Sequence, residues 1–111
     1  MTQINDKEVD KLLEMISIDN SGGPIYHYKG KPFNGIIQSF YENGNIMDEV
    51  QYTNGHIGGV QREYFESGQK KHEYFKYFAK PEGDWKEWDI NGNIIHHSIW
   101  EKGEKIKTII K

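Results

Sequence analysis

Three stretches decide the fold: residues 35–50 (GIIQSFYENGNIMDEV), 59–74 (GVQREYFESGQKKHEY) and 83–98 (GDWKEWDINGNIIHHS). Each stretch begins with a glycine, has an aromatic residue at its sixth position and continues into a turn pair that ends in glycine. The opening glycines are 24 residues apart. Units of about this length form one supersecondary element each and bury their apolar side against stacked neighbours. The chain is therefore predicted to be a repeat protein.

Within each unit, the turn pair lies between two short runs rich in aromatic and branched residues, which is the pattern of a β-hairpin. Asn54-Gly55 follows the first unit and predicts a second turn into the next strand. We expect a single-layer antiparallel meander of about six to eight strands from Ile25 to Ile110. The second unit has Ala79 in place of the turn glycine and adds Pro81. We expect a wider or irregular turn there.

The faces of the strands depend on the register of the hairpins. A two-residue loop would place Tyr41 opposite Ile46, whereas a three-residue loop with a bulge would place Phe40 opposite Ile46. We favour the second arrangement, because it aligns one continuous ladder of cross-strand contacts. The members of this ladder are Phe40, Tyr64 and Trp88, with Ile36, Ile46, Val60 and Ile94. We expect the ladder to be the core of the sheet rather than a binding site.

Residues 5–17 have the pattern of an amphipathic helix with one apolar stripe. The stripe consists of Val9, Leu12, Leu13 and Ile16. Asn5 is the expected N-cap, Glu8 completes a capping box with it, and Ile4 can pack on the first residue of the stripe as a hydrophobic staple. We expect the helix to cover one end of the sheet, where a strand edge needs protection.

The organisation that follows is one structural domain with two parts. Residues 1–24 form the capping helix and a linker, Asn20–Pro24, and residues 25–111 form the hairpin repeats, whose full units open at Gly35, Gly59 and Gly83.

Composition limits the classes of function. The chain has 111 residues, of which 35% are hydrophobic and 14% aromatic, with a net charge of −3 and no cysteine. The lack of cysteine excludes disulfides, thiolate zinc sites and a cysteine nucleophile, and it agrees with a reducing compartment. The first residues contain no long apolar run, so we expect neither a signal peptide nor a membrane span. We therefore expect a cytoplasmic protein. Nucleic acid is not an expected ligand, because clustered positive charge is missing.

The residues that carry catalytic or metal chemistry do not form a recognisable set. His72, His96 and Asp48 share one repeat column, but residues two units apart are too distant to hold one ion. Glu63 and Glu87 share a column without an implied pocket, and the serines lack the context of a nucleophile. We therefore predict no catalytic residue, no metal site and no cofactor.

Two phrases, FYENGNIMDEVQYTNGHIGG (residues 40–59) and YHYKGKPFNG (residues 26–35), closely resemble the bacterial variant of the MORN (membrane occupation and recognition nexus) repeat, in the YwqK-type antitoxin group. The shared marks are the opening glycine, the Asn-Gly turn, the aromatic pairs Phe40-Tyr41 and Tyr64-Phe65, and the closing aromatics Tyr52 and Trp100. The resemblance covers residues 26–105. Departures lie at Lys76, at Asp89 and in the turn from Ala79 to Glu82.

The resemblance implies an elongated sheet of MORN-like hairpins without catalysis. For the bacterial branch it also implies an antitoxin or immunity protein that binds and neutralises a toxin encoded beside it. The partner would be a cognate protein toxin, such as a nuclease or another basic effector, and neither nucleic acid nor a membrane. The oligomeric state stays open.

The predicted partner-binding surface combines aromatic residues with carboxylates that lie off the ladder. Its members are Tyr41, Glu49, Glu63, Phe65, Glu66, Trp85 and Glu87. Aromatic side chains on a rigid backbone suit a protein-binding face, and the carboxylates would complement a basic partner. One alternative is that these side chains only cover the sheet. A second is that the aromatics bind a quaternary ammonium ligand through cation–π contacts. A third is a structural or membrane-surface role of the repeats, for which the basic run 102–111 would serve.

Overall fold

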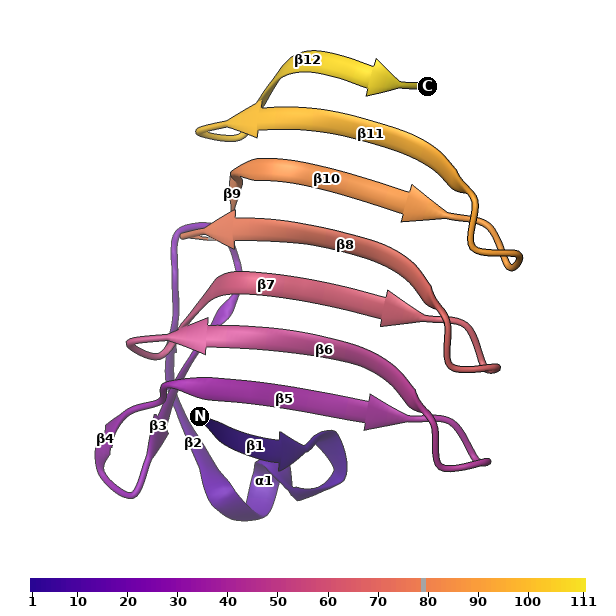
Figure 1. The fold of residues 1–111 in the computed structure, drawn as a ribbon. Helices are drawn as coiled ribbons and strands as arrows, with labels where there is room; N and C mark the ends of the chain where they lie inside the picture. The colour runs from indigo at the N-terminus through magenta and orange to yellow at the C-terminus, as the bar shows by residue number, and fades with distance from the viewer. Residues whose placement is uncertain (79) are drawn as a thin grey trace.

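The computed structural model describes residues 1–78 and 80–111 and consists mainly of β-strands (Figure 1). In chain order the elements are β1 (Thr2–Asn5), a 3-10 helix (Asp6–Glu8), α1 (Val9–Leu12), β2 (Leu13–Ile18), β3 (Pro24–Tyr28), β4 (Lys31–Pro32), β5 (Gly35–Phe40), β6 (Ile46–Thr53), β7 (His56–Tyr64), β8 (Lys70–Tyr77), β9 (Lys80–Pro81), β10 (Gly83–Trp88), β11 (Ile94–Glu101) and β12 (Glu104–Ile110). The predicted fold class, a mainly β meander of hairpins, is confirmed.

Most strands belong to one large sheet. Over the described residues it has nine strands, in the order β1-β5-β6-β7-β8-β10-β11-β12 with β9 paired to β8. From β5 onward neighbouring strands are antiparallel, whereas β1 pairs in parallel with β5. A small sheet, β2-β3-β4, lies behind the β5–β7 end in Figure 1. The protein is thus a single-layer sheet that gains a second layer at its N-terminal end.

The hairpins of the three units share the three-residue loop that the sequence favoured. Tyr41 N–H donates to the Asn45 carbonyl at 2.8 Å, which leaves three residues in the loop. Phe40 pairs with Ile46, and the register shifts just before this pair, as a bulge requires. The same register recurs in the other two units. The prediction of a three-residue loop with a bulge is therefore confirmed.

Asp89 replaces the second aromatic residue of the third unit and takes a local role in its loop. Its Oδ1 accepts hydrogen bonds from the backbone N–H groups of Asn91 (2.9 Å) and Asn93 (3.0 Å). These bonds, the one from Asn93 above all, lower the pKa of Asp89, because they favour the charged carboxylate. The departure from the repeat pattern thus keeps the loop while changing how it is stabilised.

At the end of the strands opposite to the three-residue loops, the chain makes two-residue turns. Asn54 and Gly55 have φ angles of 50° and 88°, and Lys102 and Gly103 have 50° and 86°, as a type I′ turn requires. The predicted turn at Asn54-Gly55 is confirmed. The irregular turn predicted around Ala79 lies in part outside the described residues. Directly after it, Lys80–Pro81 forms the short strand β9 on β8.

The N-terminal segment differs from the predicted helix over residues 5–17. The helical part begins as expected, with Asn5 Oδ1 accepting from Lys7 N–H at 2.9 Å, but α1 ends at Leu12. The next residues form β2, which pairs with β3 from Leu13↔Tyr28 to Ile18↔Pro24. Short isolated helices are marginal in water, so pairing with β3 and burial of Leu13 outweigh helix formation here.

Two related expectations change with the shortened helix. The expected apolar stripe does not form, because Leu12 and Ile16 are exposed while Leu13 is buried. Glu8 makes no capping hydrogen bond through its side chain. The segment Asn20–Pro24, predicted as a linker, belongs to the turn that joins β2 to β3 and to the start of β3.

The core lies between the small sheet and the N-terminal end of the large sheet. Its buried members are Ile4, Leu13, Phe33 and Tyr52, and Val9 packs against them. The Phe33 ring lies 5.8 Å from that of Tyr52. The N-terminal segment therefore does cover this end of the sheet, but through β1, β2 and a cluster around Phe33 instead of a helix stripe.

The predicted ladder is continuous, but it is not the core. Its rings of Phe40, Tyr64 and Trp88 are only half-buried, and of the whole ladder Val60 alone is buried. The ladder lies on the face opposite to that of Ile37, Val50 and Tyr52, which pack against the small sheet. Within the described residues, Figure 1 shows no second layer over the face that carries the ladder. The expectation of a ladder core was wrong because it assumed that the largest side chains of a single-layer sheet face an interior.

Gly35, the opening glycine of the first unit, is required by a close backbone approach. A Cβ at this position would collide with the Thr2 carbonyl of β1 and lie 2.8 Å from the Phe33 ring. We predict that Gly35→Ala lowers the free energy of unfolding by about 1–3 kcal/mol, because β1 must move away. Urea denaturation measures this loss.

Gly58→Ala is the matched control for this substitution. A Cβ at Gly58 meets Thr53 and His56 only at ordinary contact distances, from 3.6 Å. We expect this variant to unfold within about 0.5 kcal/mol of the parent protein. Equal losses for both variants would contradict the proposed role of the β1–β5 approach.

Candidate protein-binding surface

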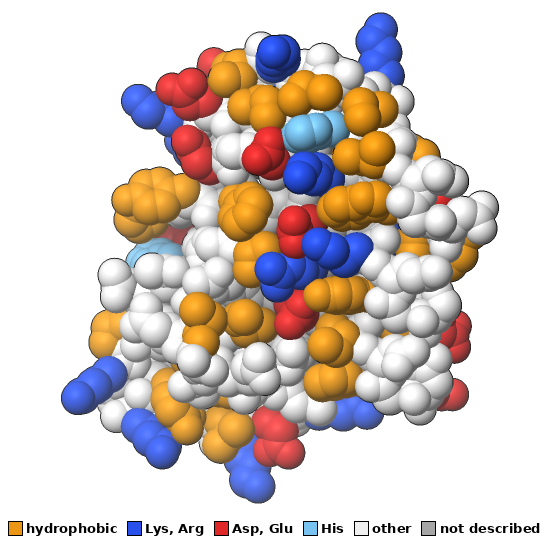
Figure 2. Space-filling view, in the orientation of Figure 1, with side chains coloured by type: hydrophobic (Ala, Val, Ile, Leu, Met, Phe, Trp, Pro, Cys, Tyr) orange, Lys and Arg blue, Asp and Glu red, His pale blue; other side chains and the backbone are white. Residues whose placement is uncertain are grey.

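The strand register assigns the side chains of the large sheet to two faces. We call the face with the predicted ladder the ladder face, and it also carries Gln38, Glu49, Arg62 and Glu73. The opposite face carries Asp48, Glu63, His72, Tyr74, Trp85, Glu87, Ser98 and Trp100. The small sheet packs on the opposite face, so Figure 2 looks onto the ladder face. There, charged side chains form a central stripe beside hydrophobic ones on the side of the three-residue loops.

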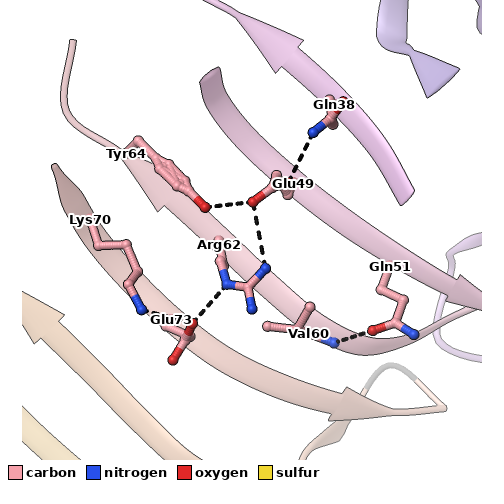
Figure 3. Close-up of polar contacts among 8 residues, drawn as sticks. All are labelled: Gln38, Glu49, Gln51, Val60, Arg62, Tyr64, Lys70 and Glu73. Atoms are coloured by element: carbon pink, nitrogen blue, oxygen red, sulfur yellow. Dashed lines mark hydrogen bonds and ion pairs between the residues drawn. The ribbon is translucent and has the colours of Figure 1, made fainter. Parts of the chain in front are cut away.

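Glu49 is the centre of a hydrogen-bond network on the ladder face (Figure 3). It is only 7% exposed. Its carboxylate accepts hydrogen bonds from the Tyr64 hydroxyl and from Gln38 Nε2, the latter at 3.0 Å, and Arg62 Nη1 lies 3.6 Å away. Burial and this carboxylate raise the pKa of Tyr64 to about 12. Glu49 therefore serves the packing of β5, β6 and β7 and is not free for a partner.

Glu73 extends the network to β8. Arg62 Nε donates to Glu73 Oε2 at 2.7 Å, and Lys70 Nζ lies 3.1 Å from the same oxygen. Burial favours the neutral acid, but these hydrogen bonds outweigh it and lower the pKa of Glu73. The carboxylates of the ladder face are thus paired with cations of the same face, which makes this face electrically balanced.

A substitution separates this structural role from a binding role. Glu49→Ala would leave the Tyr64 hydroxyl and Gln38 amide without their acceptor, and we predict a loss of about 1–3 kcal/mol in the free energy of unfolding. Glu66→Ala is the control, because Glu66 is an exposed loop residue. Urea denaturation of the two variants compares them, and an unchanged stability of Glu49→Ala would show that the network is dispensable.

The opposite face carries a strip of aromatic rings across β8, β10 and β11. The Trp85 ring stacks on Tyr74 with centroids 4.1 Å apart and an angle of 14° between the planes. On its other side, the Trp100 ring lies 5.6 Å away. Gly83 stands opposite Trp100 and has no side chain to separate the two indoles. We call Tyr74, Trp85 and Trp100 the aromatic strip.

A row of ionisable side chains borders the strip. Glu63 on β7, His72 on β8 and Glu87 on β10 are consecutive partners in the strand register. His72 Nδ1 lies 3.5 Å from Glu63 Oε2, and His72 Nε2 lies 3.4 Å from Glu87 Oε1. Glu87 also accepts a hydrogen bond from Trp85 Nε1 at 3.1 Å. The row and the strip therefore form one surface with carboxylates beside indoles.

The negative charge of this surface continues onto β6. Asp48 is the register partner of Glu63. Burial raises the pKa of Asp48, and the neighbouring charges of Glu63 and Asp6 raise it further. Asp48, Glu63 and Glu87 thus lie on one face of neighbouring strands, where their carboxylates would attract a basic partner.

The structure brings together only part of the predicted partner-binding set. Glu63, Trp85 and Glu87 share the opposite face, whereas Glu49 lies on the ladder face. Of the remaining three residues, Glu66 lies in the second three-residue loop, and Tyr41 and Phe65 directly precede the first and the second loop.

These three residues make contacts at the loop end of the strands. The Tyr41 hydroxyl donates to the Tyr64 carbonyl at 2.7 Å, and Asn43 Nδ2 donates to the Glu66 carbonyl at 3.0 Å. Lys71 Nζ lies 5.7 Å from the centre of the Phe65 ring. The two hydrogen bonds join neighbouring repeats, whereas Phe65 and Lys71 belong to the same unit.

Sequence reasoning missed Tyr74, Trp100 and His72 as members of the surface. The signal was available in the favoured register, because Trp85 stands opposite Ser98, with Trp100 two residues further along the same face. Tyr74 and His72 follow from the pairing of β8 with β10, which the irregular second unit concealed.

Within residues 1–78 and 80–111, no group of three or more His, Asp or Glu side chains is arranged to hold a metal ion. No helix in the same ranges is long and apolar enough to cross a membrane.

Comparison with known families gives one match. Residues 33–54 match the model of a MORN repeat variant. No similar curated protein was found for the chain. The matched segment includes Gly35, the first three-residue loop and Tyr52. The residues typical of the repeat are thus the ones that form the β5–β6 hairpin. The match supports a relationship with MORN-repeat proteins and indicates a protein-binding or structural repeat module.

Proposed function

We propose that this chain is a non-catalytic protein-binding module of the cytoplasm, which neutralises a cognate bacterial toxin by direct binding as an antitoxin or immunity protein. The opposite face over β8, β10 and β11 would be the contact surface. The toxin would be a nuclease or another protein with a basic active-site region, bound in place of its substrate.

The observation that carries this proposal is the aromatic strip next to the Glu63–His72–Glu87 row. Of the described residues of the large sheet, the core cluster includes side chains only from β1, β5, β6 and β7. Over the described chain, Figure 1 places no second layer on β10 and β11. Tryptophan and tyrosine are the residues that most often dominate the binding energy of protein interfaces. A rigid sheet loses little conformational entropy when it binds.

The charges of the surface favour a basic partner. Glu63 has no cation among its described contacts other than His72, whose charge depends on pH. On the ladder face, by contrast, Arg62 and Lys70 pair with Glu73. Unbalanced carboxylates increase the association rate with a positively charged protein and disfavour acidic ones.

The geometry of the rings argues against a small quaternary ammonium ligand. An aromatic cage needs rings that stand apart and surround the cation. Here Trp85 stacks directly on Tyr74 at 4.1 Å, so the space between the rings is already filled. The strip offers an extended apolar surface, which suits contact with another protein better than binding of a small cation.

Co-purification from native cells tests the antitoxin role. We expect a tagged chain to retain one stoichiometric protein, less of it at high salt, which arrests growth when expressed alone and is harmless when expressed with this chain. If the retained protein is not toxic, the chain is a protein-binding module without an antitoxin role. Recovery of the chain alone would favour a structural repeat.

A further inference from the structure

A second surface lies at the other end of the strands, where the two-residue turns are. A groove with a volume of about 740 Å³ runs along the ends of β7 and β8 and is lined by His56, Ile57, Phe75, Tyr77, Phe78 and Lys102, among others. This volume is within the range of pockets that hold a ligand side chain or a small molecule. A smaller groove continues from it past His56 and Phe78 to Asp19.

Phe78 stands out in this groove because its backbone is strained while its side chain is exposed. Its φ angle is 48°, a left-handed conformation that is rare for a bulky residue. The equivalent first turn positions carry Lys29, Asn54 and Lys102, each with φ near 50° and followed by glycine. At Phe78 the sequence continues with alanine instead.

Burial does not explain the choice of phenylalanine. Phe78 is 59% exposed and its neighbour Tyr77 is 67% exposed. The Phe78 ring makes edge contacts with His56 at 5.8 Å and with Tyr77 at 4.7 Å. A strained residue that neither suits its turn nor fills the interior points to a functional site.

Three lysines and two carboxylates line the groove and its continuation, a small excess of positive charge. Lys76 and Lys102 line it, and Lys80 lines its continuation. Of the carboxylates, Glu82 accepts the Lys102 backbone N–H at 2.7 Å. Asp19 accepts from Ser21 and Gly23 and contacts His56, and these bonds, led by that from Ser21, lower its pKa to about 2. The two carboxylates are held by local hydrogen bonds, and Lys76 Nζ lies 5.7 Å from the centre of the Tyr74 ring, which leaves Lys80 and Lys102 to face a ligand.

We propose that this groove binds an acidic peptide segment of a partner protein, with one large apolar side chain held between Phe75, Tyr77 and Phe78. The lysines would pair with carboxylates on both sides of that anchor. The site lies at the end of the strands that carries the two-residue turns, away from the three-residue loops. Its excess charge is opposite in sign to that beside the aromatic strip. The proposal therefore does not depend on the antitoxin role.

Fluorescence anisotropy with defined peptides tests this groove. The probe is a fluorescein-labelled pool of nonapeptides with Trp, Phe or Leu at the centre and Asp or Glu at the flanking positions. The matched pool has Lys at the same positions. We expect the acidic pool to bind more tightly than the basic pool and to lose affinity as salt is added, because exposed charge pairs are screened.

Two variants connect the binding to the groove. Asparagine accepts a left-handed backbone, so Phe78→Asn should melt at or above the temperature of the parent protein. We expect it to bind the acidic pool at least about tenfold more weakly, because the apolar contact is lost. Lys102→Asn should reduce affinity for the acidic pool alone. Ile90→Asn, an exposed apolar position in the third unit's loop, is the control and should bind like the parent.

Three results would overturn the proposal. They are equal binding of the two pools, unchanged affinity of folded Phe78→Asn, and failure of the acidic pool to bind at all. Vesicles of phosphatidylserine and phosphatidylcholine are measured in parallel. Binding to the vesicles that depends on Phe78, without peptide binding, would assign the aromatic residues and lysines to a membrane surface instead. A failed antitoxin assay with intact peptide binding would affect only the aromatic strip.

Discussion

Phe33→Ala is expected to lower the free energy of unfolding by about 3–5 kcal/mol, the loss typical of a large buried aromatic residue. Phe33 is 1% exposed and contacts the rings of Tyr28 and Tyr52 from the one region where two layers meet. Domains of this size have a total stability of only about 5–15 kcal/mol, so the variant should be close to unfolding at room temperature. Urea denaturation monitored by tryptophan fluorescence measures the loss.

Phe75→Ala is the matched control for this prediction. Phe75 lies on β8, where its ring is exposed and outside the core cluster. We expect it to unfold within about 1 kcal/mol of the parent protein, as surface substitutions usually do. If Phe75→Ala proved as destabilising as Phe33→Ala, the core would extend along the whole sheet and would not be limited to its N-terminal end.

Trp85→Ala is expected to weaken the complex with the partner by at least about 2 kcal/mol, about 30-fold in Kd, because a central tryptophan is a typical hot spot. Trp85 is the middle ring of the aromatic strip, and its removal also frees Glu87 from its hydrogen bond. Calorimetry with the co-purified partner measures the change in affinity.

Trp88→Ala provides the control on the same strand. Trp88 is half-buried like Trp85, but it lies on the ladder face, where Lys70 Nζ is 5.1 Å from its ring. Since the two tryptophans are similarly buried, we expect comparable losses of stability and a loss of affinity only for Trp85→Ala. Weaker binding by Trp88→Ala alone would transfer the contact surface to the ladder face.

The sequence predicted the large sheet well because its signals are local. The loop that joins Phe40 to Ile46 is decided by the Asn-Gly pair and the bulge, and the same chemistry recurs in each unit. The turn at Asn54-Gly55 follows from residues that accept positive φ angles. These features need no knowledge of distant parts of the chain.

The N-terminal segment could not be predicted in the same way, since its structure depends on distant partners. Leu13 and the residues after it have a pattern compatible with a helix, but β3 offers them a strand partner and Tyr52 a buried contact. The pairing of β1 with β5 depends likewise on Gly35, which the sequence marks as the start of a repeat without revealing that Thr2 approaches it. Tertiary contacts overrode helix periodicity there.

The candidate surface was predicted in part for a related reason. Trp85, Glu63 and Glu87 were identified from their types and their place off the ladder, and the register puts them on one face. Glu49 lies on the ladder face instead, and residue type alone does not reveal that Tyr64 and Gln38 enclose its carboxylate. The pairing of β8 with β10, across the irregular unit, was needed to add Tyr74.

Hydroxyl-radical footprinting of the complex tests the central claim most directly, namely that the opposite face over β8, β10 and β11 contacts the partner. Mass spectrometry measures side-chain oxidation of the free chain and of the chain bound to its co-purified partner. The account predicts that oxidation of Tyr74, Trp85 and Trp100 falls on binding while that of Trp88 is unchanged. Protection of Trp88 and Tyr64 with an unprotected aromatic strip would contradict it.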